Sequence, residues 1–130
     1  MKTKLEEKRG RAKKANALIA FIASCGRKFF NHSGKISHME VDDRGRIWFI
    51  NAYNGKRIYT HYTQGRWRGF GEGGTLRDLI IRLRDYICTG KNIGKALAYP
   101  DWYSNSDPWG YNEDMEKVYK KALELGIVAE

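Results

Sequence analysis

The chain has 130 residues, of which 42% are hydrophobic and 13% aromatic, so it is long enough for one modest core and too apolar for a disordered protein. Its 24 lysines and arginines outnumber its 15 acidic residues, and the net charge of +9 favours an anionic partner. No apolar run approaches the roughly 18 residues of a membrane span, and Cys25 and Cys88 have no neighbours at metal-ligand spacing. We therefore expect a cytoplasmic protein without a metal ion or other cofactor and without a membrane partner.

The N-terminal segment is strongly basic. Residues 1–14 carry seven bases and two acids, spread over every side of the segment. Because such a segment has no apolar face to bury, we expect residues 1–10 to form a mobile arm before a single domain over residues 11–130. Apolar residues then recur at helical spacing as far as Cys25, which predicts a helix over residues 11–25 and leaves a backward extension open.

Residues 28–62 have the pattern of a three- or four-stranded antiparallel meander. A turn at Ser33-Gly34 starts it, and a three-residue loop with Gly45 in a bulge would pair Val41 with Ile47 and Met39 with Phe49.

The dipeptide Asn54-Gly55 predicts a type I′ turn in the next hairpin. That turn would pair Ile50 with Tyr59 and Trp48 with His61. Side chains alternate between the two faces of a sheet, so these registers predict one apolar face and one aromatic, partly basic face. The apolar face would hold Met39, Val41, Ile47, Phe49, Ile58 and Tyr62, and the opposite face His38, Glu40, Trp48, Ile50, Arg57, Tyr59 and His61.

Two further helices complete an α+β fold in which helices flank and cover the meander. Thr75 is a suitable N-cap for a helix over residues 75–89, which would cover the apolar face of the sheet. Asn112 would cap a last helix over residues 113–125. The apolar stripe of the helix over residues 75–89 comprises Leu76, Leu79, Ile80, Leu83 and Ile87.

Three basic or aromatic features suggest a non-catalytic nucleic-acid-binding protein. The first is the outer sheet face, where Trp48, Arg57, Tyr59 and His61 could stack on unpaired bases of single-stranded RNA or DNA or lie in a groove of a duplex, unless another element covers them. The second is the glycine-rich loop 64–74, where Arg66 and Arg68 would grip phosphates and Trp67 would either stack on a base or cap the core. The third is a run of bases that would either neutralise phosphates or form a solvated tail: Lys8, Arg9, Arg11, Lys13 and Lys14.

Two alternatives belong to other functional classes. An inhibitor that docks on a host protein or ribonucleoprotein would use an aromatic cluster as its anchors, although such rings more often fill a core: Trp102, Tyr103, Trp109 and Tyr111. A small metal-dependent nuclease or hydrolase would use His38 or His61, but no nucleophile or metal spacing accompanies them. We therefore do not expect an enzyme.

The block GRIWFINAYNGKRIYTHYTQGRWRGFGEGGTLRDLIIRLRDYI, residues 45–87, resembles small uncharacterised basic proteins of bacteriophages and prophages. The resemblance implies a phage accessory protein in the host cytoplasm, whose partner is nucleic acid, DNA or RNA, or a host defence complex. It implies no catalytic residue.

Overall fold

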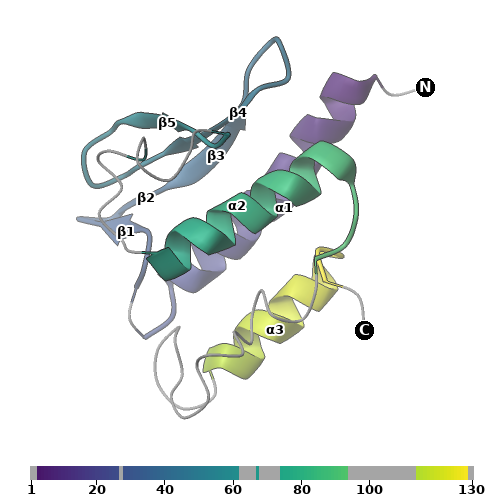
Figure 1. Ribbon diagram of the computed structural model, residues 1–130. Coiled ribbons are helices and arrows are strands. Elements are labelled where there is room, and N and C mark those ends of the chain that lie inside the picture. The colour runs from purple at the N-terminus through teal and green to yellow at the C-terminus, as the bar shows by residue number, and fades with distance from the viewer. Residues whose placement is uncertain (1–2, 27, 62–66, 68–73, 94–113, 129–130) are drawn as a thin grey trace.

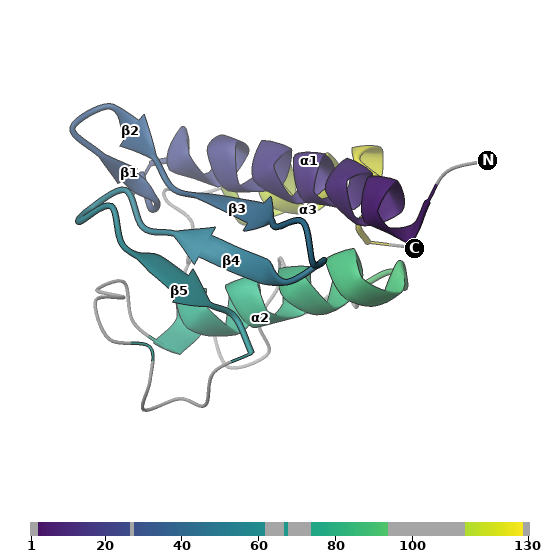
Figure 2. The ribbon, with the colours of Figure 1, turned by 90° about the horizontal axis from the view of Figure 1, so that it is seen from above.

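The computed structural model describes residues 3–26, 28–61, 67, 74–93 and 114–128 (Figure 1). The described elements are, in chain order, α1 (Lys4–Ala23), β1 (Asn31–His32), β2 (Lys35–Ile36), β3 (His38–Val41), β4 (Ile47–Ile50), β5 (Arg57–Tyr59), α2 (Gly74–Thr89) and α3 (Asp114–Glu124). Strands β3, β4 and β5 form an antiparallel sheet on one side of the helix pair α1 and α2, and α3 lies on the other side of that pair (Figures 1 and 2). The predicted α+β fold is confirmed.

Helix α1 begins at Lys4, so the backward extension that the sequence left open is present. Thr3 caps the helix, because its Oγ1 accepts a hydrogen bond from the Glu6 N–H at 3.1 Å. Glu6 also lies in the first turn, where the helix dipole favours a negative charge. Residues 4–10 are therefore helical, and charged side chains in this stretch contact other elements, as described below.

The register of the β3–β4 hairpin is the predicted one. Met39 pairs with Phe49 and Val41 with Ile47, and Gly45 has the positive φ of +80° that the bulged loop needs.

The predicted β4–β5 register is wrong by two residues, since Ile50 pairs with Arg57 and Trp48 with Tyr59. The loop closes at Asn51 instead of Tyr53: the Asn51 N–H donates to the Lys56 carbonyl at 3.0 Å. The Asn51 side chain also accepts from the Tyr53 N–H at 2.9 Å, which stabilises this longer loop. A shift of two residues keeps every side chain on its predicted face.

Strands β1 and β2 form a separate hairpin and not part of a continuous meander. Its turn lies at Ser33-Gly34 as predicted, with φ of +52° and +85°. The chain bends on both sides of this hairpin, where Phe30 is buried and the Ser37 N–H donates to the Phe30 carbonyl at 2.8 Å.

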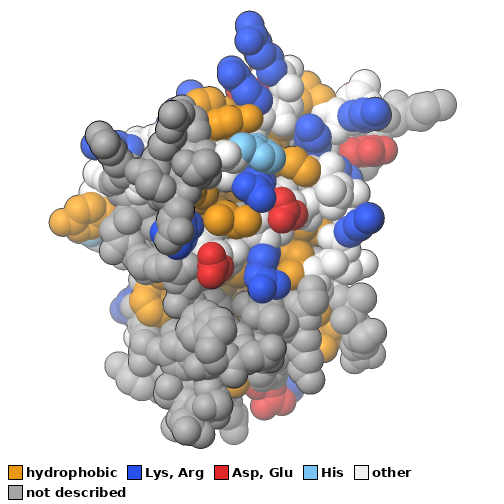
Figure 3. Space-filling view, viewed as in Figure 1, with side chains coloured by type: hydrophobic (Ala, Val, Ile, Leu, Met, Phe, Trp, Pro, Cys, Tyr) orange, Lys and Arg blue, Asp and Glu red, His pale blue; other side chains and the backbone are white. Residues whose placement is uncertain are grey.

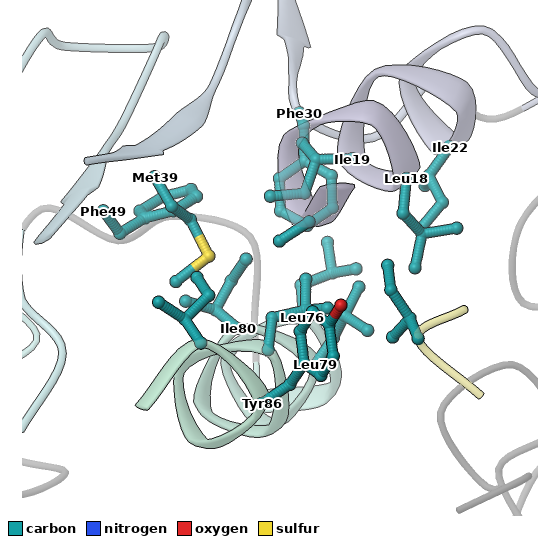
Figure 4. Close-up of a cluster of buried hydrophobic side chains, with 14 of the residues drawn as sticks. Leu18, Ile19, Ile22, Phe30, Met39, Phe49, Leu76, Leu79, Ile80 and Tyr86 are labelled. Carbon is teal, nitrogen blue, oxygen red and sulfur yellow. The ribbon is translucent and has the colours of Figure 1, made fainter. Parts of the chain in front are cut away.

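The core lies between the sheet and the two helices. In Figure 4, Met39 and Phe49 from the sheet face Leu76 and Ile80 from α2, with Phe30 beside them. The predicted stripe of α2 is fully buried, and the helix begins one residue before the proposed cap Thr75. Tyr62 and the proposed cap Asn112 lie outside the described residues.

At the C-terminal end, Val128 is buried and forms an isolated parallel bridge with Ile93, which the sequence did not reveal. None of the helices in the described part of the chain is long and apolar enough to cross a membrane.

Candidate nucleic-acid interface

The side of the three-stranded sheet that faces away from α1 and α2 is called the outer face here. Figure 2 looks onto it. The prediction of two unlike faces is confirmed, because Met39, Phe49 and Ile58 are buried whereas the opposite side chains are half-buried or exposed. Helix α1 packs beside and beneath β3 and does not cover the outer face. The outer face comprises His38, Glu40, Trp48, Ile50, Arg57 and Tyr59.

Asp42, in the loop after β3, fixes the position of Trp48. Its Oδ2 accepts a hydrogen bond from the Trp48 indole Nε1 at 3.0 Å and another from Arg46 Nε at 2.9 Å. Its Oδ1 accepts from the backbone N–H groups of Arg44 and Arg46 at 3.0 and 2.9 Å. These hydrogen bonds hold the pKa of Asp42 far below its usual value of 3.8, and the bond from Trp48 has the largest effect.

The lowered pKa of Asp42 predicts an acid-dependent loss of stability. At neutral pH the carboxylate is ionised in both states, and its donors stabilise only the folded one. As pH falls below 3.8 the unfolded state takes up a proton first, so the stabilisation declines and is lost below the folded pKa. We expect Asp42→Asn to lower the melting temperature at pH 7, and the difference from wild type to shrink towards pH 2.

The control for this prediction is Asp43→Asn, one residue further on. The side chain of Asp43 is 99% exposed and forms an ion pair with Arg9 at 3.0 Å. Thermal unfolding at several pH values should show a smaller loss for this variant at pH 7. An Asp42→Asn deficit that stays constant down to pH 2 would contradict the assignment.

Three rings follow one another along the outer face and just beyond β5, and we call them the ring row: Trp48, Tyr59 and His61. Ring centroids are 5.2 Å apart between Trp48 and Tyr59 and 5.3 Å apart between Tyr59 and His61. The corrected register explains the row, because it places Trp48 directly opposite Tyr59.

Two arginines flank the Trp48 ring. The Arg57 guanidinium carbon lies 4.4 Å from the ring centroid and that of Arg46 lies 5.8 Å away, both within cation–π range. Their side chains are 51% and 47% exposed, so each guanidinium still meets solvent. Arg57 also pairs loosely with Glu40, at 4.0 Å.

His61 has a lowered pKa, chiefly because the ring is partly buried and also because Arg84 is near. Its ring is therefore neutral at pH 7, where it can take part in stacking but does not add positive charge. Its Nε2 lies 3.9 Å from Cys88 Sγ. The other histidine on this side, His38, contacts Glu40 at 3.1 Å. No group of three or more potential metal ligands lies together within the described residues.

Three bases of the N-terminal segment contact other parts of the protein. Lys8 Nζ donates to the Gly45 carbonyl at 3.2 Å, and Arg9 pairs with Asp43. Arg11 Nε donates to the Ile87 carbonyl at 2.8 Å. These contacts join the first turns of α1 to the β3–β4 loop and to the end of α2. Figure 3 shows basic side chains projecting from this end of the molecule. Of the five bases proposed to neutralise phosphates, the other two, Lys13 and Lys14, are exposed.

Trp67 does not belong to the interface. Its side chain is 6% exposed and joins the core, so the alternative in which it caps the core is the one the structure shows. Its loop partners Arg66 and Arg68 lie outside the described residues, as does the proposed protein-binding cluster of Trp102, Tyr103, Trp109 and Tyr111.

Comparison with known proteins identifies the family. The model of the YoqU family matches residues 5–130, far beyond residues 45–87, on which the phage resemblance was based. The SPbeta prophage-derived uncharacterized protein YoqU of Bacillus subtilis strain 168 is 29% identical over 115 residues, which cover 87% of this chain and 79% of the relative. No solved structure matches the chain. The predicted resemblance to prophage proteins is confirmed, and the chain belongs to the YoqU family.

Proposed function

We propose that this protein binds nucleic acid through the outer face of its sheet and does not act on it chemically. The observation that carries the proposal is the ring row with its two flanking guanidinium groups. Unpaired bases stack on aromatic rings and on guanidinium planes, and Arg57 over Trp48 offers both surfaces at one place. Because Asp42 holds the indole in position, little ordering of Trp48 is needed when a base binds.

Phosphates would be bound around the β3–β4 loop, next to the ring row. Arg44 and Arg46 lie in or beside this loop, and Lys8 and Arg9 reach it from α1. Some of this charge is neutralised by Asp42 and Asp43, so the net attraction comes from the surplus of bases. In this arrangement the N-terminal bases act as part of a surface built with the sheet and not as a separate arm.

The prophage relative supports a phage accessory role. We propose that this role is exercised on nucleic acid in the host cytoplasm. The relationship to a prophage protein is equally compatible with docking on a host protein or defence ribonucleoprotein. A pull-down from host lysate with and without nuclease separates the two, because partners held through nucleic acid are lost on digestion. Partners that remain after digestion would favour the docking alternative.

The salt dependence of binding tests the proposal directly. Raising the salt concentration two- to threefold should weaken oligonucleotide binding about tenfold or more, because several phosphate contacts release counterions. Arg57→Gln should weaken binding several-fold, because the guanidinium plane over Trp48, on which a base would stack, is lost. Fluorescence anisotropy with labelled oligonucleotides measures both quantities.

Lys120→Gln is the matched control for Arg57→Gln. Lys120 lies on α3, its side chain is 72% exposed, and it forms an exposed ion pair with Glu116 at 3.5 Å. Lys120→Gln therefore removes one positive charge and one exposed ion pair, as Arg57→Gln does, but at a site remote from the sheet. Equal loss of affinity in the two variants, or affinity that does not change with salt, would refute binding at the outer face.

A further inference from the structure

A hollow of about 810 Å³ lies between the β1–β2 hairpin and the β4–β5 loop, and we call it the groove. Its volume falls within the range of roughly 300–1,000 Å³ that is typical of small-ligand sites. The walls are His32 and Ile36 from the hairpin and Tyr53 from the loop, and the floor includes Ile50 of β4. The groove is therefore formed by two turns that are far apart in the sequence.

Apolar and aromatic surface is unusually exposed in this groove. Tyr53 is 67% exposed and Ile36 is 41% exposed, and these two are the exposed large hydrophobic residues of the described chain. The rings of His32 and Tyr53 meet edge to face, with centroids 4.7 Å apart. Exposed apolar side chains that gather in one hollow are typical of a binding site, because a single ligand can contact all of them.

The charge of the groove suits an anion. Lys35 is the positively charged side chain among the described residues that line it, and these residues include no Asp or Glu. A ligand with both a flat apolar ring and a negative group matches the two kinds of wall at once. A nucleotide has this chemistry, since its base can stack on Tyr53 while its phosphate lies near Lys35.

The groove is continuous with the outer face. His38 and Ile50 line the groove and also form a cross-strand pair on the outer face. Ile50 pairs on its other side with Arg57, which covers Trp48. Neighbouring residues on one face of a strand are about 7 Å apart, so a short oligonucleotide can reach both the groove and Trp48.

The hairpin that forms one wall, together with the residues that lead into it, has an unusual backbone conformation. Lys28, Phe30 and Ser33 all have positive φ, of 51°, 68° and 52°, although none is glycine. Buried Phe30 and the Ala52 N–H, which donates to Ser37 Oγ at 2.9 Å, hold the hairpin and the loop in place. Backbone strain of this kind gathers at binding sites, where the surrounding structure maintains it.

We propose that the groove binds one unpaired nucleotide, with its base against Tyr53 and Ile36 and its phosphate near Lys35, so that the protein prefers single-stranded to duplex nucleic acid. This inference rests on the proposed function and specifies the form of nucleic acid that the same surface takes. A base within a duplex is paired and stacked, so it cannot enter the groove without being extruded.

The test compares Tyr53→Ala with Tyr53→Phe on single-stranded DNA and RNA 12-mers and on a duplex of the same length. Wild type should bind one or both single strands more tightly than the duplex, and the two single strands show which sugar is preferred. Tyr53→Ala should weaken single-strand binding about fivefold or more, because a stacking platform is lost. Tyr53→Phe keeps the ring and should stay within about twofold of wild type. Duplex binding should be the same in all three proteins.

The outcomes separate this inference from the function on which it rests. If oligonucleotides bind but the duplex binds as tightly as the single strands, or Tyr53→Ala binds like wild type, the groove is not a nucleotide site and the outer face remains the interface. If no oligonucleotide binds to wild type, the proposed function fails and the groove assignment fails with it. Tyr53 is mostly exposed, so a melting curve should show that both variants remain folded.

Discussion

Replacing Phe49 by alanine is expected to lower the free energy of unfolding by about 3–5 kcal/mol, the usual cost of removing a buried aromatic ring. Phe49 is fully buried at the middle of β4, and its ring meets that of Phe30 edge to face at 6.0 Å between centroids. Figure 4 shows the ring between the sheet and α2, and because a protein interior is closely packed, removing the ring leaves a cavity there. Urea unfolding followed by circular dichroism measures the loss.

Ile36→Ala is the control for this substitution. It removes an apolar side chain from a strand of the same region, but Ile36 is 41% exposed and lies outside the core. We expect a loss of less than about 1 kcal/mol, because little buried surface disappears. Similar losses for Phe49→Ala and Ile36→Ala would mean that the sheet does not pack on the helices as described.

Local patterns predicted the elements whose burial follows a simple period. The 3.6-residue stripe of α2 and the two-residue alternation of β3 and β4 are visible in the sequence, and both faces came out as expected. The position of Gly45 in the sequence also predicted the bulge, because few residues other than glycine tolerate a φ of +80°. These features depend on residues close together in the chain, so no tertiary information is needed.

The errors have one distant and one local cause. The first turns of α1 have no apolar face, but Lys8 bonds to Gly45, 37 residues away. In the β4–β5 loop, the backbone bond from Asn51 to Lys56 closes a longer loop than the predicted Asn54-Gly55 turn, and the Asn51 side chain accepts a further bond from Tyr53. For Trp67 the sequence left two alternatives open, and the structure shows the one in which Trp67 packs in the core.

For the candidate site, the sequence identified the side chains but not their arrangement. Trp48, Arg57 and Tyr59 were assigned to one face by alternation, and they lie there. The roles of Asp42 and Arg46 were missed. An Asp at the start of a turn often accepts hydrogen bonds from the turn's backbone, and an Arg four residues later could have been recognised as its partner. The groove carries no such signal, because its two walls meet only after both turns have folded.

Asn16→Ala is expected to destabilise the protein by about 2–4 kcal/mol, because two backbone groups of the edge strand β3 lose their partner. The Asn16 side chain acts in place of a neighbouring strand: its Oδ1 accepts from the Met39 N–H at 2.7 Å, and its Nδ2 donates to the Met39 carbonyl at 2.9 Å. Both bonds are partly buried between α1 and the sheet, so water replaces them poorly. Urea unfolding and the exchange rate of the Met39 amide proton measure the effect.

The helix propensity of alanine works against this loss, which makes the prediction stricter. Alanine is a better helix former than asparagine by up to about 0.7 kcal/mol. If helix propensity were the only effect, Asn16→Ala would therefore stabilise the protein. Ala20→Asn, at an exposed position of the same helix, measures the propensity difference alone. If Asn16→Ala proves neutral and leaves the Met39 amide as protected as before, the Asn16 bonds do not help to hold α1 to the sheet. If stability falls and exchange of that amide rises, one side-chain amide both joins the helix to β3 and blocks the edge at which another strand could add.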